Sequence, residues 1–219
     1  MKKNKTLANL IFHTVYWTIV SSIIFVICHL FFDIPIANYF HDHSNTFTTA
    51  LGKIIAKAFD PNVWIVVMII VASYSGYLVF IKKSFSPRAQ KWLTISLSLI
   101  IAIGITGVLK IVLGRYRPVA LFNSGLYGFT FEGTFRKANS TPSGHVALAF
   151  AGFMAIASCL EKRKWLYFAV VISILIAISR IITSKHYLGD VILGAYVGLL
   201  SFYWGKYIAR KFVTYKQVR

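Results

Sequence analysis

The chain has 219 residues, of which 57% are hydrophobic, 16% aromatic and only 14% charged. This balance excludes an ordinary water-soluble domain, because the hydrophobic residues fall in runs of about 20, the length that crosses a bilayer. A net charge of +18 is a signature of nucleic-acid binding, but here fifteen of the 24 basic residues lie in alternate loops, as the positive-inside rule expects of cytoplasmic segments. They are Lys2, Lys3, Lys5, Lys82, Lys83, Arg88, Lys91, Lys162, Arg163, Lys164, Lys206, Arg210, Lys211, Lys216 and Arg219.

The apolar runs predict six membrane-spanning helices. They cover approximately residues 10–32, 62–81, 92–113, 145–160, 165–183 and 187–207. Each can cross a hydrocarbon core about 30 Å thick, and the short fourth would start inside the preceding loop. The first run lacks a cleavage site and predicts a retained span. We therefore expect an all-α polytopic membrane bundle that forms one integral-membrane domain over residues 1–219. Both termini would be cytoplasmic, and the connections 33–61, 114–144 and 184–186 would face outward.

Residues 45–60 carry apolar side chains at helical spacing, with two lysines off that stripe. The apolar residues are Phe47, Leu51, Ile54, Ile55 and Phe59, and the lysines are Lys53 and Lys57. The pattern predicts an amphipathic helix, which either lies in the outer membrane interface or packs on the bundle as an ordinary loop helix. Asp60 and Pro61 then predict the N-cap and first-turn proline of the second span.

Several polar groups outside the main motifs have simpler interpretations. His13 and His29, in the first span, predict interhelical hydrogen bonds or interfacial positions. His41 and His43 form a pair that could bind a metal, but no carboxylate or cysteine accompanies them, so a solvated loop is favoured. Residues 139–141 match a glycosylation sequon only weakly, because a proline follows directly.

The third span ends in a cluster of basic residues. Lys110 and Arg117 are seven positions apart, so they share a face if the helix persists, and Pro118 predicts that the helix ends at Arg117. Basic residues at the end of a span usually extend to the interface as anchors, and this interpretation accounts well for Arg115. It accounts poorly for Lys110, which lies deeper and at an outward-facing end.

The fourth span opens with Thr141-Pro142-Ser143-Gly144-His145. We expect Thr141 to be its N-cap and Pro142 its first-turn residue, which leaves the amides of Ser143, Gly144 and His145 free. A helix N-terminus of this kind, with a glycine that permits close approach, binds anions. His145 would stand beside the anion as a proton donor.

A third polar stretch joins the fifth and sixth spans and contains Arg180, His186 and Asp190. On one helix, the four-residue spacing of His186 and Asp190 would put them on the same face. A carboxylate there holds one imidazole nitrogen as N–H and leaves the other bare, which makes the histidine a nucleophile or base. Arg180 supplies a fixed positive charge nearby. Taken alone, the stretch is equally consistent with an interfacial loop.

By the predicted topology, the three polar stretches all end at the outward membrane face. Together they bring cations, amide donors and two histidines, of which one has a carboxylate within reach. This combination predicts a site that binds a phosphate group and carries out chemistry on it. The candidate residues are Lys110, Arg117, Ser143, Gly144, His145, Arg180, His186 and Asp190.

These motifs resemble the signature of the type-2 phosphatidic acid phosphatase family, which reads K-x6-RP, PSGH and SR-x5-H-x3-D. Here they stand as Lys110…Arg117-Pro118, Pro142-Ser143-Gly144-His145 and Ser179-Arg180…His186…Asp190, with every position and spacing kept. The resemblance implies that His186 attacks phosphorus to form a phosphohistidine, that Asp190 orients it, and that His145 protonates the leaving group and later activates water. It also implies that Lys110, Arg117, Ser143, Gly144 and Arg180 hold the phosphate oxygens.

The resemblance implies no metal or other cofactor, and of the six acidic residues only Asp190 is expected in the site, too few carboxylates for Mg²⁺. We expect a lipid phosphate phosphatase in a bacterial inner membrane, with its site on the periplasmic face and no nucleic-acid partner. Candidate substrates are phosphatidic acid, phosphatidylglycerol phosphate, undecaprenyl diphosphate and lipid A phosphate. Phosphoryl transfer to another acceptor and anion transport are the alternatives, and the oligomeric state and the particular lipid stay open.

Overall fold

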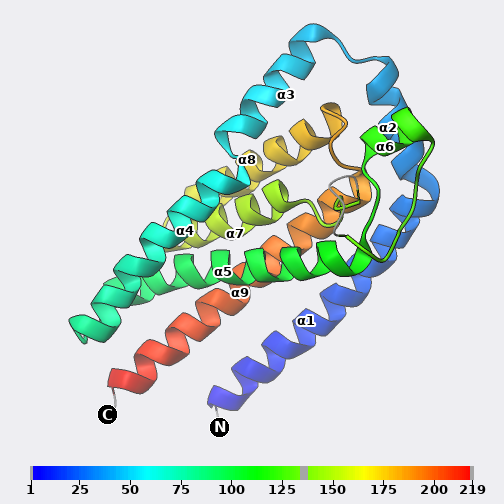
Figure 1. Ribbon diagram of the computed structural model, residues 1–219. Helices are drawn as coiled ribbons and strands as arrows, with labels where there is room; N and C mark the ends of the chain where they lie inside the picture. Colours follow the sequence, from blue (N-terminus) through cyan, green and yellow to red (C-terminus); the bar gives the residue numbers. More distant parts are fainter. Residues whose placement is uncertain (1, 134–137, 218–219) are drawn as a thin grey trace.

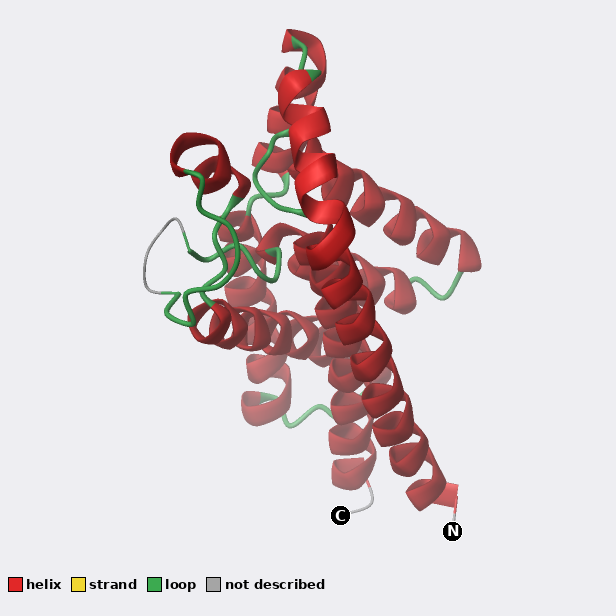
Figure 2. Cartoon of the chain, turned by 90° about the vertical axis from the view of Figure 1, so that its right-hand side faces the viewer, coloured by secondary structure: helices red, strands yellow, loops and turns green. Residues whose placement is uncertain are grey.

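The computed structural model describes residues 2–133 and 138–217, and nearly all of these residues are helical. The order is α1 (Lys2–Ile27), the π-helix η1 (Cys28–Phe32), α2 (Asp33–Asp42), α3 (Thr46–Ala58), α4 (Pro61–Gly76), the π-helix η2 (Tyr77–Ile81), α5 (Pro87–Leu113), α6 (Pro118–Ser124), α7 (Gly144–Cys159), α8 (Arg163–Ile182) and α9 (Leu188–Gln217). Figure 2 shows these helices joined by loops, with no strand drawn in the described parts. The predicted all-α class is confirmed.

Five helical stretches are long and apolar enough to cross a membrane. They are Thr6–Asp42, Thr46–Ile81, Pro87–Leu113, Arg163–Ile182 and Leu188–Lys216. The sixth apolar helix, α7, has 16 residues, in keeping with the short fourth run of the sequence. The first two stretches are longer than predicted, because α1 continues through η1 into α2 and because α3 leads directly to α4. In Figure 1 the start of α1 and the end of α9 lie at one end of the bundle, and α2 and α6 lie at the other.

The helix α9 is central, with α1, α5 and α7 packed against it (Figure 1). Two glycines one turn apart allow α7 to approach closely. A Cβ added to Gly194 would lie 2.8 Å from the carbonyl oxygen of Ser143, and one added to Gly198 would lie 2.5 Å from that of Ala147. Small residues at this spacing let helix backbones meet in membrane bundles. The contact sets the start of α7 against the start of α9.

A Gly198→Leu substitution is expected to destabilise the bundle, because the new side chain would overlap the Ala147 carbonyl and the Cβ of Phe150. Overpacking of this kind costs roughly 1–3 kcal/mol, and more where backbone must move. Gly104→Leu is the matched control, since nothing lies within 4 Å of a Cβ at Gly104 in α5. The thermal unfolding midpoint in detergent should fall for the first variant only. Equal midpoints would contradict the packing argument.

The predicted amphipathic helix is α3, and it packs on α8. A Cβ added to Gly52 would lie 2.8 Å from the side chain of Thr183, so the two helices are in close contact. This supports the interpretation of α3 as a helix packed on the bundle. The predicted start of α4 is confirmed, because Asp60 is its N-cap, with Pro61 in the first turn, and accepts a hydrogen bond from the Asn62 amide at 2.8 Å.

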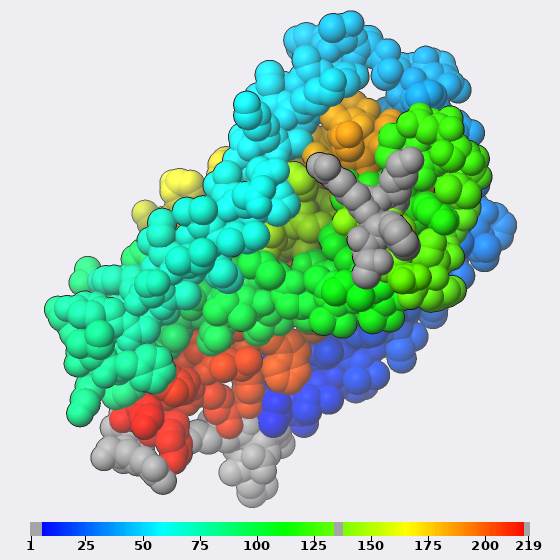
Figure 3. All heavy atoms as spheres, in the orientation of Figure 1, coloured from blue at the N-terminus to red at the C-terminus, as the bar shows by residue number. Residues whose placement is uncertain are grey.

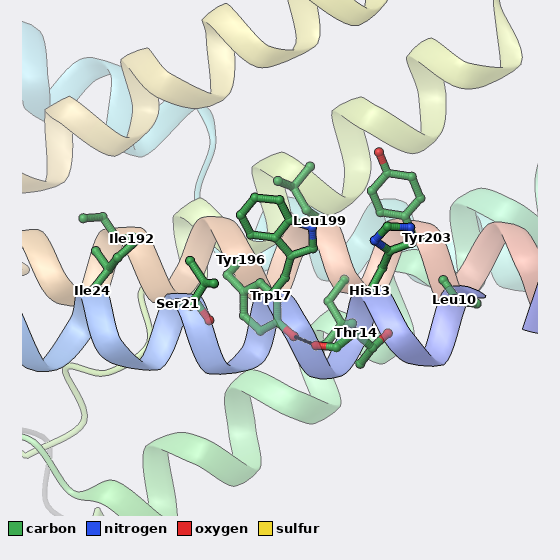
Figure 4. Close-up of a pocket in the computed structure, with 12 residues that line it drawn as sticks. Leu10, His13, Thr14, Trp17, Ser21, Ile24, Ile192, Tyr196, Leu199 and Tyr203 are labelled. Atoms are coloured by element: carbon green, nitrogen blue, oxygen red, sulfur yellow. Dashed lines mark hydrogen bonds between the residues drawn. The ribbon is translucent and has the colours of Figure 1, made fainter. Parts of the chain in front are cut away.

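A groove of about 620 Å³ runs between α1 and α9 (Figure 4). It is mostly apolar and is lined by Leu10, His13, Thr14, Trp17, Val20, Ser21, Ile24, Ile192, Tyr196, Leu199, Leu200 and Tyr203. Polar contacts join its two walls: the hydroxyls of Thr18 and Tyr196 hydrogen-bond, and Trp204 Nε1 donates to Thr14 Oγ1 at 3.0 Å. None of the motif residues, all of which the structure describes, lines this groove, so the expected phosphate site lies elsewhere.

Candidate active site

The three sequence motifs meet at the end of the bundle away from the start of α1 and the end of α9 (Figure 1). Lys110 lies in the last turn of α5, His145 in the first turn of α7, Arg180 in the last turn of α8 and Asp190 in the first turn of α9. In the space-filling view of Figure 3 the α8–α9 connection, in orange, is visible between α3 in cyan and α6 in green. The convergence at one end follows the prediction from the topology.

His186 and Asp190 are buried beside each other, with 3% and 0% of their surfaces exposed. The Nδ1 atom of His186 lies 3.6 Å from Oδ2 of Asp190. The two residues do not share a helix, because α9 begins only at Leu188 and His186 lies in the connection before it. The carboxylate nevertheless faces Nδ1, as predicted, which leaves Nε2 as the nitrogen for a substrate.

Burial lowers the pKa of His186 to about 3, although the neighbouring Asp190 carboxylate acts in the opposite direction. The positive charges of Lys110 and Arg117 lower this pKa further. The imidazole is therefore neutral at pH 7, and a neutral imidazole has the free electron pair that a nucleophile needs.

Hydrogen bonds hold both oxygens of the Asp190 carboxylate. Oδ2 accepts from the Ser140 hydroxyl at 2.5 Å and from the Tyr187 amide at 2.9 Å. Oδ1 accepts from Arg115 Nη1 at 2.7 Å and from the Thr141 hydroxyl. A carboxylate with donors on both oxygens has a fixed orientation, which in turn fixes the direction in which it meets His186.

The prediction that Thr141 caps the fourth span is wrong. Its hydroxyl bonds to Asp190 instead, and the helix begins later, with Ser143 at the N-cap position and Gly144 as the first helical residue. The Ser143 amide is not free either, since it donates to the carbonyl oxygen of Asp190 at 3.0 Å. The amides of Gly144 and His145 remain in the first turn, where the helix backbone supplies no acceptor.

The two cations of the first motif are held by Asn139, a residue that in the sequence stands out only as part of a weak glycosylation sequon. Lys110 Nζ donates to its carbonyl oxygen at 2.5 Å, and Arg117 Nε donates to its side-chain oxygen at 2.9 Å. The helix α5 does not persist to Arg117, the condition for a shared face with Lys110, because Gly114 adopts a left-handed φ of 52°. The helix ends at Leu113, the predicted end of the third span. The chain between the cations turns, and Asn139 brings them together again.

Two polar atoms of the candidate phosphate-binding set are buried without a hydrogen-bond partner among the described residues. They are Oγ of Ser143 and Nε of Arg180. The side chain of Lys110 lies beside the start of α7, since a Cβ added to Gly144 would lie 3.9 Å from Lys110 Cε. Buried polar groups are rarely left unpaired, and the oxygens of a bound phosphate would satisfy both atoms.

A model of the PAP2 superfamily matches residues 91–213, more than half of the chain and all three motifs. The chain belongs to the PAP2 superfamily. Among curated proteins, the lipid A 1-phosphatase of Rhizobium etli is 25% identical over 155 residues, which cover 68% of this chain and 66% of that protein. The match thus spans slightly less than two thirds of the relative's length.

Two solved structures share the fold. The PAP2-type phosphatidylglycerolphosphate phosphatase from Bacillus subtilis superimposes with a TM-score of 0.61 and 20% identity, covering 88% of this chain and 96% of its own. Aquifex aeolicus LpxE superimposes with a TM-score of 0.54 and 20% identity, covering 82% of this chain and 94% of its own. With the apolar helices described above, this fold makes the protein an integral membrane protein.

One interpretation of a residue outside the PAP2 signature is wrong. Arg115 is not an interfacial anchor, because it is completely buried and forms ion pairs with Asp33 at 2.5 Å and Asp190 at 2.7 Å. An anchor keeps its charged end in water. Local sequence could not reveal this, since both carboxylates are supplied by distant parts of the chain.

The expectation that only one carboxylate reaches the PAP2 site is also wrong. Besides Asp190, Asp33 contacts Arg115, and Asp60 Oδ2 lies 3.8 Å from His145 Nε2. Asp60 therefore stands beside the second histidine, at the point where α4 begins. Within residues 2–133 and 138–217, no three His, Cys, Asp or Glu side chains form a group suited to a metal ion.

The other predicted histidine contacts are partly present. His29 Nδ1 lies 2.7 Å from the Tyr127 hydroxyl and 3.0 Å from Arg115 Nη2, so it is a hydrogen-bonding partner as predicted, but of the loops that follow α6 and α5 and not of another helix. His41 stacks on Phe122 with ring centroids 3.9 Å apart, so at least one member of the His41–His43 pair packs against the protein.

Proposed function

We propose that the protein is a metal-independent phosphatase that hydrolyses a phosphomonoester or diphosphate of a membrane lipid through a phosphohistidine on His186. The observation that carries the proposal is the pair of unpartnered buried atoms, Ser143 Oγ and Arg180 Nε, in the motif cluster that also holds a neutral, buried His186. Support comes from the PAP2 superfamily, and the matched relative from Rhizobium etli is itself named a lipid A 1-phosphatase.

In the first step, Nε2 of His186 attacks phosphorus. The new P–N bond forms as the P–O bond to the leaving group breaks, and His145 gives its proton to the departing oxygen. The leaving group is the lipid alcohol of a monoester or the lipid monophosphate of a diphosphate. The Asp190 carboxylate, 3.6 Å from Nδ1 of His186, stabilises the positive charge that develops on the ring.

In the second step, water attacks the phosphohistidine. His145, which has just lost its proton, accepts one from the water, the P–N bond breaks, and inorganic phosphate leaves. In both steps the phosphoryl oxygens are held by Lys110, Arg117 and Arg180, with the Ser143 hydroxyl and the Gly144 amide. Fixed positive charge of this kind provides most of the stabilisation in phosphoryl transfer.

The site lies at the end of the bundle away from the start of α1 and the end of α9 (Figure 1). Since basic segments precede the first span and follow the last, the positive-inside rule puts both termini in the cytoplasm. The site would then face the periplasm of a bacterial inner membrane. A lipid could keep its acyl chains in the bilayer while its phosphate enters from the interface.

Vanadate, a phosphate mimic, is expected to inhibit the enzyme, and Arg180→Ala should weaken this inhibition by roughly 10-fold or more, because a charge-assisted hydrogen bond is worth about 1.5–3 kcal/mol. Arg163→Ala removes the same charge at the other end of α8 and is the control. Inhibition constants measured for both variants test the contact. An unchanged constant for Arg180→Ala would remove this residue from the phosphate site.

The proposed function is tested by phosphate release from purified protein in detergent, with EDTA present. The substrates are phosphatidic acid, phosphatidylglycerol phosphate, undecaprenyl diphosphate, lipid A and a soluble sugar phosphate. EDTA-resistant release that favours one lipid supports the proposal and identifies the substrate. Phosphate release from the sugar phosphate alone would refute the proposal. A folded protein that releases no phosphate from any substrate and binds no vanadate would also refute it. If the protein binds vanadate but releases no phosphate from any of these substrates, phosphoryl transfer to an acceptor would be favoured.

A further inference from the structure

Arg115 lies outside the three motifs, and the mechanism above does not use it. We propose that Arg115 is a positioning residue for the catalytic carboxylate Asp190, and that Asp33, at the start of α2, holds Arg115 in place. The N-terminal helices would thereby control the reactivity of His186. This inference rests on the proposed function for the role of Asp190.

The geometry shows a chain of buried charges. Arg115 Nη2 donates to Asp33 Oδ2 at 2.5 Å, Arg115 Nη1 donates to Asp190 Oδ1 at 2.7 Å, and all three side chains have 0% exposure. The other oxygen of Asp33 accepts the amide of Gly189 at 2.8 Å. Asp33 therefore holds both the guanidinium and the backbone residue directly before Asp190.

Stability alone does not account for this arrangement. Desolvation of buried charges offsets much of their attraction, and well-packed apolar residues of similar size are often neutral or more stable. Although burial acts against it, the carboxylates of Asp190 and Asp33 raise the pKa of Arg115 above its ordinary value, so the guanidinium is a permanent positive charge. A buried chain of three charged groups, Asp33–Arg115–Asp190, that ends on one oxygen of the catalytic carboxylate is better explained by a role in the reaction.

Aromatic rings surround the guanidinium on several sides. Its central carbon lies 4.6 Å from the ring centroid of Tyr187, 5.2 Å from Phe25, and 5.5 Å from both Tyr127 and Phe129. Burial also raises the pKa of Tyr127 to about 12, so its hydroxyl stays protonated. The rings exclude water and lower the local dielectric constant, which strengthens the hold of Arg115 on Asp190.

The backbone that supplies Asp33 has an uncommon conformation. The π-helix η1 contains His29 and ends at Phe32, directly before Asp33. Both His29 and Asp33 contact Arg115. Short π-helical insertions in α-helices are rare and occur often at functional sites. Here the insertion sits where two side chains of the first helical stretch reach the same guanidinium.

The two oxygens of Asp190 are thus divided between different partners. Arg115 and Thr141 donate hydrogen bonds to Oδ1. Oδ2 accepts one from the Ser140 hydroxyl and faces His186. With Arg115 in place the carboxylate cannot rotate freely, and Oδ2 stays opposite Nδ1. Without Arg115 or Asp33, only Ser140, Thr141 and the Tyr187 amide would hold the carboxylate. The imidazole would then be oriented less precisely, while the phosphate-binding side chains would keep their positions.

The test uses Asp33→Asn, which preserves volume, together with Arg115→Lys and the double variant. Because catalytic misalignment of about 1 Å costs on the order of 100-fold, kcat should fall roughly 10- to 100-fold in each single variant. The KM and the vanadate inhibition constant should stay within about twofold of the parent values, since phosphate binding is untouched. The double variant should lose little more than the worse single variant, because both residues act through one carboxylate.

Rates are normalised to the amount of folded protein, measured as vanadate-binding sites, so that misfolding does not imitate a catalytic loss. Lys91→Met is the control, since it breaks the exposed Lys91–Glu161 ion pair of 2.7 Å. An unchanged normalised kcat in Asp33→Asn and Arg115→Lys, or a rise in KM alone, would overturn the inference. Because the parent protein must first be active, failure of the proposed function would be seen separately.

Discussion

A His186→Ala variant is expected to release phosphate at least about 10⁴-fold more slowly than the parent protein, the scale of loss seen when an enzyme loses its nucleophile. The variant has no atom in place of Nε2, so no covalent intermediate can form. The fold should persist, since Asp190 keeps its hydrogen bonds to Arg115, Ser140 and Thr141. Steady-state phosphate release and the thermal midpoint in detergent are the measurements.

Covalent labelling adds a direct observation. With a radiolabelled phosphate ester whose leaving group departs without a proton, His145→Ala should still form the phosphohistidine and then hydrolyse it slowly, because His145 serves as base in the second step. Acid-labile label should therefore accumulate in His145→Ala and be absent in His186→Ala. If acid-labile label is found in the His186→Ala variant, a residue other than His186 is the nucleophile.

Asp190→Asn is expected to have two separable effects. The first is catalytic: kcat should fall roughly 10³- to 10⁴-fold, because an amide cannot stabilise the charged imidazole or enforce its tautomer. The second is structural, because Arg115 keeps only one of its two buried carboxylates. Removal of one partner from a buried ion pair costs about 3–5 kcal/mol, so the thermal midpoint should also fall.

The comparison of rate with binding separates these effects. The vanadate inhibition constant of the folded Asp190→Asn protein should change far less than kcat, since the phosphate-binding side chains are contributed by other residues. Parallel losses of vanadate affinity and rate would instead make Asp190 a structural residue. A pH profile gives a second criterion, because the variant should not regain activity at any pH at which the protein stays folded.

The helical architecture could be predicted because it depends on local quantities. The length of each apolar run gave the helix positions, and Asp60 with Pro61 gave the start of α4. The convergence of the motifs also followed, since the parity of the spans decides which ends share a membrane face. The signature residues then identified the site cluster, although their individual roles stay predictions.

The contacts that support the cluster could not be predicted, because they join distant parts of the chain. Arg115 meets Asp33 across 82 positions and Asp190 across 75, and no local pattern distinguishes such a residue from an interfacial anchor. The contacts of Asn139 with Lys110 and Arg117 could not be predicted for the same reason, since they depend on a turn at Gly114 that brings these two residues back together. Thr141 has the right chemistry for a cap, but the helix begins two residues later than a Thr141 cap requires, with Ser143 at the N-cap position, and the Thr141 hydroxyl donates to Asp190.

The carboxylate of Asp33 also bears on how the chain can be dissected. The region matched to the PAP2 superfamily begins at residue 91, whereas Asp33 and Asp60 both lie before it and touch Arg115 and His145. A fragment limited to residues 91–213 would keep every signature residue but leave the guanidinium with half its counter-charge. The boundaries of the matched family region and those of the buried charge network therefore differ in this protein, and grafting the signature onto another bundle would have to bring the first helical stretch with it.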